Sequence, residues 1–267
     1  MLNLCRRILI ITIFSLTLCA CQTSPTGRQQ IIIISDTEMS QLGAASFSQM
    51  KEGNPPVSNT TLSRYVNCLS TPLLIAASET PNDWEVKVFE DENPNAFALP
   101  GNKIGVNTGM IKLAASPGQL AAVIGHEIAH VQARHGAERV SLNMTSKAIQ
   151  QAAAIAVNGK EYGSIAMAAI GLGAQYGVLL PYSRTHESEA DYLGLQIMAK
   201  AGFDPEEAIA LWRNMEKSSD GKPPEFMSTH PANATRIKQL SAAMQKAKQL
   251  LPKNSNANTQ CVKPTLP

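Results

Sequence analysis

The chain has 267 residues, enough to bury a substantial core; 44% of them are apolar and 16% are charged. This composition excludes a disordered or highly charged tail protein. The 23 Lys and Arg residues exceed the 21 Asp and Glu residues only through Arg6 and Arg7, so the chain beyond residue 20 is neutral. Neutrality and an aromatic content of 5% argue against nucleic acid as a partner, because phosphate binding needs basic excess and single strands need stacking platforms.

Residues 1–20 are typical of an export signal peptide. Arg6 and Arg7 precede an apolar run over residues 8–18, which is shorter than the roughly 20 apolar residues that span a bilayer. A membrane anchor that stays attached is the alternative. The sequence Leu-Cys-Ala-Cys that ends at Cys21 resembles the lipobox of bacterial lipoproteins, in which the last cysteine is acylated and becomes the N-terminus. We therefore expect a lipid on Cys21.

The residue after the expected lipid indicates a location. Gln22 stands where aspartate resembles an inner-membrane retention signal in enteric bacteria, so we expect the outer membrane of a Gram-negative bacterium, facing the periplasm. Cys68 and Cys261 are then the remaining cysteines, an even pair in an oxidising compartment. A disulfide between them and two free thiols are both open, because sequence spacing does not give their distance in space.

The first predicted elements follow the lipid site. Residues 21–30 are polar and rich in turn formers, and we expect them to form a tether. Ser35 and Glu38 have the spacing of a capping box, which predicts a helix from there to about Lys51. Apolar residues at helical spacing predict a second helix over residues 58–79.

The hydrophobic period then changes to that of a sheet. Residues 84–89 alternate between apolar and polar side chains, as in a half-buried strand. Residues 95–99 and 103–107 flank a Pro-Gly-Asn turn, which predicts a hairpin. The chain is predicted to be helical again from Pro117. The expected fold class is therefore α+β and mainly helical.

The second half is predicted to be helical. Residues 146–180 are rich in Ala, Gly and Ile, and their polar interruptions favour two closely packed helices over a membrane span, which is the alternative. Residues 204–207 and Pro231 begin two further helices, and residues 252–267 form an irregular tail. No internal repeat is visible, so we expect one domain over residues 31–251.

The sequence Gly-His-Glu-Ile-Ala-His at 125–130 contains the pattern H-E-x-x-H. On a helix, His126 and His130 lie on one face about 6 Å apart, so both can bind one Zn²⁺. Glu127 is then aimed beside the metal and can take a proton from a zinc-bound water. The apolar residues around the pattern are typical of a buried helix. The alternative is two ordinary histidines and a glutamate that forms a salt bridge.

A catalytic zinc site has three protein ligands and leaves one position to water. His135 is the nearest further histidine, but it lies about half a helical turn away from the metal-facing side. Glu187 and Asp191 share a helical face, so Glu187 can bind the metal while Asp191 accepts the second ring N–H of a ligating histidine. Their neighbours His186 and Glu189 face elsewhere and are the weaker candidates.

Together, H-E-x-x-H at 126–130 and E-x-x-A-D at 187–191 resemble the gluzincin metallopeptidases grouped with the CAAX prenyl protease, the heat-shock protease HtpX and the mitochondrial Oma-type protease. Residues 25–30, 95–101 and 229–231 also resemble segments of the periplasmic lipoprotein members of this family. The resemblance covers nearly all of the chain beyond the signal peptide.

The resemblance implies a fold and an activity. It implies a zincin-like core with a small sheet or hairpin beside the H-E-x-x-H helix. It also implies one Zn²⁺ per chain with His126, His130 and Glu187 as ligands, and Glu127 as general base in the hydrolysis of internal peptide bonds. The implied substrates are polypeptides, misfolded envelope proteins in particular.

Three further residues are candidates for contacts with a substrate. A peptide can bind as an added strand at a sheet edge, and the strand that begins at Asn95 is the candidate edge. Asn95 either contacts the peptide or belongs to the packing of the strand. His230, before a proline at a helix start, can stabilise the tetrahedral oxyanion, a role the resemblance favours over a helix cap or surface histidine. Arg236 can share this role.

Two other functions fit part of the pattern. A periplasmic chaperone-like lipoprotein could hold a structural zinc, but such a site needs no carboxylate like Glu127 beside its ligands. An amidase acting on peptidoglycan is also a zinc hydrolase, and the pairing of the two motifs speaks against it. Assays with peptide and glycopeptide substrates distinguish the two hydrolases.

Overall fold

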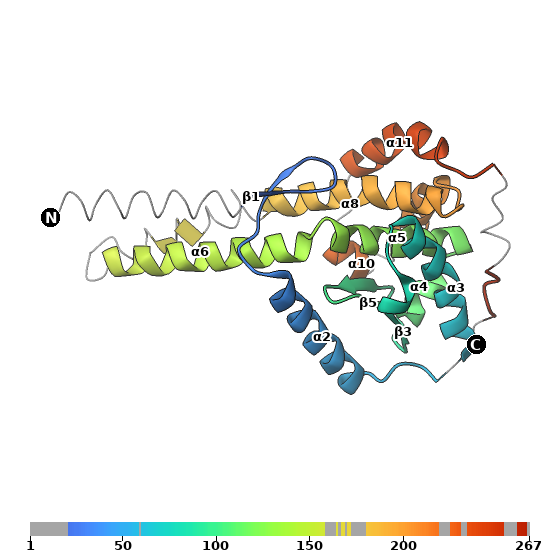
Figure 1. Ribbon diagram of the computed structural model, residues 1–267, viewed down its shortest axis with the longest axis horizontal. Helices are drawn as coiled ribbons and strands as arrows, with labels where there is room; N and C mark the ends of the chain where they lie inside the picture. The colour runs from blue at the N-terminus through green and yellow to red at the C-terminus, as the bar shows by residue number, and fades with distance from the viewer. Residues whose placement is uncertain are drawn as a thin grey trace. The chain divides into compact units, whose positions relative to one another are not determined.

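The computed structural model (Figure 1) describes residues 21–58, 60–157, 164, 167–168, 170–171, 180–218, 225–230, 234–253 and 261–265. The predicted signal peptide and Pro231 lie outside these residues. The chain divides into two compact units. The larger combines Met39–Gln132 with Thr185–Pro267, and the smaller combines Met1–Glu38 with Ala133–Arg184. The domain expected over residues 31–251 contributes to both.

The larger unit contains a three-stranded sheet of β3 (Glu85–Phe89), β4 (Ala96–Leu99) and β5 (Lys103–Asn107). The strand order is β3-β5-β4, in which β5 is parallel to β3 and antiparallel to β4. The predicted strand and hairpin are confirmed. Gly101 and Asn102 in the connecting turn both have positive φ, which glycine and asparagine tolerate best. In this sheet β4 is an edge strand.

The other described elements of the larger unit are helices. The larger unit contains α3 (Thr60–Ala76), α4 (Thr108–Leu113), α5 (Pro117–Gln132), α9 (Glu206–Ser218), α10 (Glu225–Thr229) and α11 (Ala234–Lys248), together with the short helix η1 (Pro81–Asp83). Two more helices, α2 (Asp36–Gly53) and α8 (Leu180–Lys200), have residues in both units. This content confirms a mainly helical α+β fold.

Helix α5 carries the H-E-x-x-H pattern and is the most buried of these helices. It starts with Pro117 after Ser116, whose hydroxyl accepts a 3.1 Å hydrogen bond from the backbone N–H of Gln119. All of its residues from Gly118 to Ala129 are buried. A run of small and aliphatic side chains therefore fixes this helix inside the core before any ligand is considered.

Cys68 of α3 and Cys261 are joined by a disulfide with a Cα–Cα distance of 5.8 Å. Lys263 then donates through Nζ to the carbonyl oxygens of Ala114, at 2.6 Å, and Lys112, at 3.3 Å. These carbonyls lie at the C-terminal end of α4, where a cation is favoured. The described part of the tail has no helix or strand, as expected, but a disulfide and hydrogen bonds hold it in place.

In the smaller unit, the stretch expected to be a tether forms a hairpin. Strands β1 (Cys21–Thr23) and β2 (Gln29–Ile31) pair antiparallel, with Gly27 at positive φ between them. The unit also contains α6 (His135–Val157). Arg28 donates two hydrogen bonds to Glu138 of α6, at 2.9 and 2.7 Å, and Glu138 is fully buried. A buried ion pair thus holds residues whose polar composition suggested an open linker.

Two further predictions concern the capping box at Ser35 and the Ala- and Gly-rich stretch from residue 146. The capping box is confirmed, because Ser35 N donates to Glu38 Oε2 at 3.0 Å and Glu38 N donates to Ser35 Oγ at 3.2 Å. Helix α6 covers the start of the Ala- and Gly-rich stretch, but most of residues 158–179 lie outside the described part. No helix within the described residues is long and apolar enough to cross a membrane.

Candidate metal centre

Helices α5 and α8 lie side by side (Figure 1). Where they cross, each has a glycine at the contact, next to the predicted ligand His126. A Cβ atom on Gly194 of α8 would lie only 2.9 Å from the Cα of His126. A Cβ on Gly125 would lie 3.3 Å from the carbonyl oxygen of Gly194. Because neither residue has a side chain, the two backbones approach closely enough for ligands on both helices to meet.

Four side chains converge near this crossing: His126, His130, Glu187 and His230 each offer one ligand atom, and these atoms lie within 4.8 Å of one another. The Nε2 atoms of the two α5 histidines are 3.0 Å apart. The Glu187 carboxylate lies 3.4 Å from His126 Nε2 and 3.5 Å from His130 Nε2. Two nitrogens and one carboxylate facing one point are a donor set suited to zinc.

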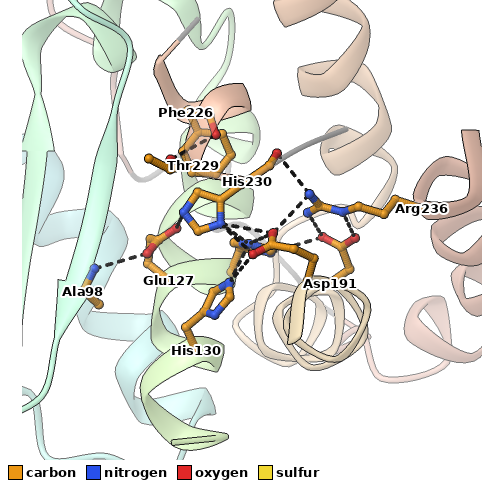
Figure 2. Close-up of polar contacts among 10 residues, drawn as sticks. Ala98, Glu127, His130, Asp191, Phe226, Thr229, His230 and Arg236 are labelled. Atoms are coloured by element: carbon orange, nitrogen blue, oxygen red, sulfur yellow. Dashed lines mark hydrogen bonds and ion pairs between the residues drawn. The ribbon is translucent and has the colours of Figure 1, made fainter. Parts of the chain in front are cut away.

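His230 was predicted to bind the oxyanion, but its ring also lies within hydrogen-bonding distance of the predicted metal ligands. Its Nδ1 lies 3.1 Å from both oxygens of Glu187 and 3.3 Å from His126 Nε2. The backbone N–H of His230 donates to the carbonyl of Phe226 in α10, and the two rings stack at a centroid distance of 4.6 Å (Figure 2). Sequence reasoning noted only that His230 precedes a proline at a helix start, and it missed that the ring reaches the metal ligands.

Glu127 lies beside the cluster but is not part of it. Its Oε2 accepts a 3.2 Å hydrogen bond from the backbone N–H of Ala98 in β4, and its Oε1 lies 3.4 Å from His230 Nε2 (Figure 2). The side chain is buried, and burial raises the pKa of the Glu127 carboxyl, while the charges of His230 and His126 act in the opposite direction. A carboxylate with a raised pKa is a stronger base than an exposed one and is suited to accept a proton.

Asp191 lies behind the first ligand. Its Oδ1 is 3.1 Å from His126 Nδ1, so the ring presents Nε2 to the cluster. Burial acts to raise the pKa of Asp191, but hydrogen bonds with Arg236 and then His126 outweigh it and hold that pKa below its ordinary value. Asp191 is therefore ionised and can orient the imidazole.

The charges of the described residues around the cluster do not balance. Three carboxylates, on Glu127, Glu187 and Asp191, are buried here, and the guanidinium of Arg236 pairs with the last two. Ionised carboxylates would leave two negative charges if the imidazoles were neutral, and buried charges need compensation. Without a cation a proton compensates in part: burial lowers the pKa of His126, but Asp191 and Glu187 raise it to about 9. A divalent cation fits both the donor set and this deficit.

Comparison with known protein families agrees with this geometry. Residues 58–244 match the model of peptidase family M48. The chain belongs to peptidase family M48. This match includes both motifs and the helices that carry them. It confirms the resemblance drawn from the sequence and the predicted enzyme class, a metallopeptidase.

Curated relatives of this M48 chain come from eukaryotes and bacteria. It is 35% identical over 195 residues to the mitochondrial metalloendopeptidase OMA1 of Schizosaccharomyces pombe, covering 70% of this chain and 53% of the relative. It is 27% identical over 222 residues to the beta-barrel assembly-enhancing protease of Escherichia coli K12, covering 79% and 44%. The corresponding putative protease of Vibrio cholerae is 30% identical over 202 residues, covering 73% and 42%. The chain thus spans about half the length of these relatives.

The position of Arg236 argues against its predicted role as a substrate contact. The residue is 2% exposed, and its guanidinium donates to Asp191 at 2.7 and 2.8 Å and to the carbonyl of His230 at 3.1 Å. It also forms an ion pair of 3.1 Å with Glu187. These partners direct the guanidinium toward the carboxylates of the cluster rather than toward solvent.

The remaining candidates are placed as follows. Asn95 precedes the edge strand β4, and its carbonyl accepts a 3.0 Å hydrogen bond from Asn107 N, so its backbone continues the β4–β5 ladder. His135 is outside the cluster because α5 ends at Gln132 and Arg134 has a φ of 55°, so His135 starts a different helix; a continuous helix had been expected. His186 and Glu189 are buried and are not among the four cluster residues.

Proposed function

We propose that this M48 chain is a zinc-dependent endopeptidase of the bacterial envelope that holds one Zn²⁺ per chain. The observation that carries the proposal is the convergence of His126, His130 and Glu187 with a separate buried carboxylate, Glu127, beside them. A purely structural metal site has no use for that additional carboxylate. Bound zinc would polarise the scissile carbonyl and acidify the attacking water.

Glu127 is proposed as the general base and then the general acid. Burial raises its pKa, so the carboxylate can take the proton of the attacking water and deliver it to the leaving amine. The backbone N–H of Ala98 holds Oε2, which leaves Oε1 turned toward His230. His230 Nε2 is proposed to donate a hydrogen bond to the oxyanion that develops on the carbonyl.

The substrate is proposed to bind as an added strand along β4. Within the described sheet, β4 pairs with β5 on one side only, and Ala98 points its N–H away from β5 toward Glu127. An extended peptide on this side would pass beside the base with its main chain hydrogen-bonded, and would be bound with little sequence preference. Asn95, at the start of the strand, is the proposed side-chain contact.

The proposed location and substrates follow from the N-terminal sequence and from the bacterial relatives. Cys21 is proposed to carry the lipid that anchors the chain to the outer membrane, facing the periplasm. Two bacterial relatives are named for enhancing beta-barrel assembly. We accordingly propose misfolded outer-membrane polypeptides as the substrates.

The test is cleavage of casein by the purified chain that starts at residue 21, beside Glu127→Ala, with zinc content determined on both samples. We expect one zinc per chain in both and cleavage by the parent alone. Zinc in both without cleavage by either would favour the chaperone-like alternative. Equal cleavage by Glu127→Ala would disprove the assignment of the base. Peptidoglycan fragments serve as a second substrate and would be cleaved only by an amidase.

A further inference from the structure

We propose that Arg236 is a positioning residue that holds Glu187 and Asp191 in the orientation needed for the metal and so sets the affinity for zinc. The proposal rests on the metal site proposed above and goes beyond it. It replaces the expectation that Arg236 contacts substrate, because every contact of its guanidinium given above is to the cluster or to the backbone of His230.

The contact with Asp191 is the strongest of these. Arg236 Nε lies 2.7 Å from Oδ2 and Nη2 lies 2.8 Å from Oδ1, which is a two-bond fork between planar groups. The same Oδ1 lies 3.1 Å from His126 Nδ1. Rotation of the carboxylate would break the fork, so the arginine fixes the oxygen that orients the first metal ligand.

The other face of the guanidinium reaches the third ligand. Arg236 Nη1 is 3.1 Å from Glu187 Oε2 and also donates to the carbonyl oxygen of His230 at 3.1 Å. Glu187 Oε2 in turn lies 3.4 Å from His126 Nε2. One rigid cation therefore contacts Glu187 of the cluster. It also contacts Asp191 behind the cluster and the backbone of His230 (Figure 2).

The surroundings of Arg236 restrict its movement. Its Cζ lies 4.6 Å from the centre of the Trp212 ring, and the side chain is 3% exposed. The guanidinium lies over this indole while its N–H groups make the hydrogen bonds, and the ammonium of a lysine cannot do both. Lysine keeps the positive charge, so Arg236→Lys removes the geometry and retains most of the electrostatic compensation.

The experiment measures zinc affinity of Arg236→Lys and of the parent by competition with a chelator of known affinity. Loss of a group that orients a ligand typically weakens metal binding by about 10- to 100-fold, and we expect a loss in this range. Arg213→Lys, an exposed arginine on α9, is the matched control and should bind zinc within about twofold of the parent. Far-UV circular dichroism of the metal-free proteins checks that the fold is kept.

Two further measurements separate positioning from a direct role with substrate. Cobalt bound to Arg236→Lys should show a shifted visible spectrum, because its ligands are reoriented. In an Asp191→Asn background the same change should weaken zinc binding by less than about threefold, because the two residues act in one chain of contacts. If Arg236→Lys alone does not fold, the comparison is made between Asp191→Asn and the double variant Asp191→Asn, Arg236→Lys.

The outcomes distinguish this proposal from the proposed function. If the parent binds zinc and cleaves casein while Arg236→Lys has the zinc affinity and cobalt spectrum of the parent, the positioning role is wrong. A raised KM of Arg236→Lys with unchanged zinc affinity would show that Arg236 contacts the substrate instead. If the parent binds no zinc, the proposed function and this inference both fail.

Discussion

Two buried charge clusters, one in each unit, are built from similar groups with different balance. In the smaller unit, one guanidinium, on Arg28, meets one carboxylate, on Glu138, and the amide of Gln30 adds a 3.0 Å hydrogen bond to the same carboxylate. Among the described residues of the larger unit, the guanidinium of Arg236 pairs with two carboxylates, on Glu187 and Asp191. A third buried carboxylate, on Glu127, lies beside them, and three imidazoles converge with Glu187. Within the part of the chain that the structure describes, the charges of Arg28 and Glu138 cancel, whereas the carboxylates around Arg236 exceed its one positive charge and leave the second cluster open to a cation.

This difference separates a structural charge cluster from a functional one. A buried ion pair that is fully hydrogen-bonded holds two segments together and leaves no group available for a ligand. A buried cluster with excess negative charge is unstable by itself unless protons or a metal ion compensate it. Burial alone would have given Glu138 and Glu187 the same interpretation, and only the balance of charge and donors tells them apart.

The largest expected effect comes from removing a carboxylate of the open cluster. Glu187→Gln removes a metal ligand and half of the excess negative charge, so zinc affinity should fall by more than about 100-fold, beyond the usual cost of losing a group that only orients a ligand. Glu138→Gln should leave zinc affinity within about twofold. Competition with a chelator measures the zinc affinity of both variants. An equal loss of zinc affinity in the two would contradict the assignment of one cluster to metal binding and the other to structure.

The cluster of Arg28 and Glu138 should instead govern folding stability. Glu138→Gln leaves Arg28 without its carboxylate, and the free energy of unfolding should fall by about 3 kcal/mol, the lower end of the range for a broken buried pair, because the Arg28 side chain is 19% exposed. Urea unfolding of the metal-free protein provides the number. A midpoint unchanged from that of the parent would show that the pair is not structural.

The glycine crossing gives an intermediate effect. Gly194→Ala places a Cβ 2.9 Å from the backbone of His126, so α8 must shift and stability should fall by about 1–3 kcal/mol, with weaker zinc binding. Gly53→Ala is the matched control, since a Cβ there meets nothing within 4 Å. Equal zinc affinities for the two variants would show that the spacing of α5 and α8 does not position the ligands.

The smallest effect is expected at a partly exposed ion pair of the sheet. Lys51 and then Lys103 lower the pKa of Glu85, against the effect of burial. A lowered folded pKa stabilises the fold above the ordinary value of 4.5, and this contribution is lost as the pH falls through the folded pKa. Glu85→Gln should cost less than about 1 kcal/mol at neutral pH and nothing in acid, as urea unfolding at both pH values can test.

Local patterns predicted much of this architecture. The capping box of α2, the strand β3, the β4–β5 hairpin and the buried helix α5 all follow from periodicity or turn residues within a short window. The placement of His126 and His130 on one face is also local, because residues four apart on a helix are neighbours. These features depend on little beyond their own segment.

The features that sequence reasoning missed depend on contacts between distant segments. His230 lies 104 residues from His126, and no local pattern shows that its ring stacks on Phe226 beside the ligands. Arg236 was predicted to contact the substrate, and its buried position depends on contacts with Asp191 and Trp212, which come from other helices. Residues 21–30 were predicted to be a tether from their polar composition. The partner of Arg28 is Glu138 in α6, which is too distant in the sequence for a local pattern to show.

The most direct test of the account is to restore zinc stepwise to the metal-free chain that starts at residue 21 while following zinc bound and casein cleaved. The open cluster predicts no cleavage without zinc, and activity that rises in proportion to bound zinc until one equivalent is taken up. Full activity without metal, or zinc that binds without restoring any cleavage, would contradict it.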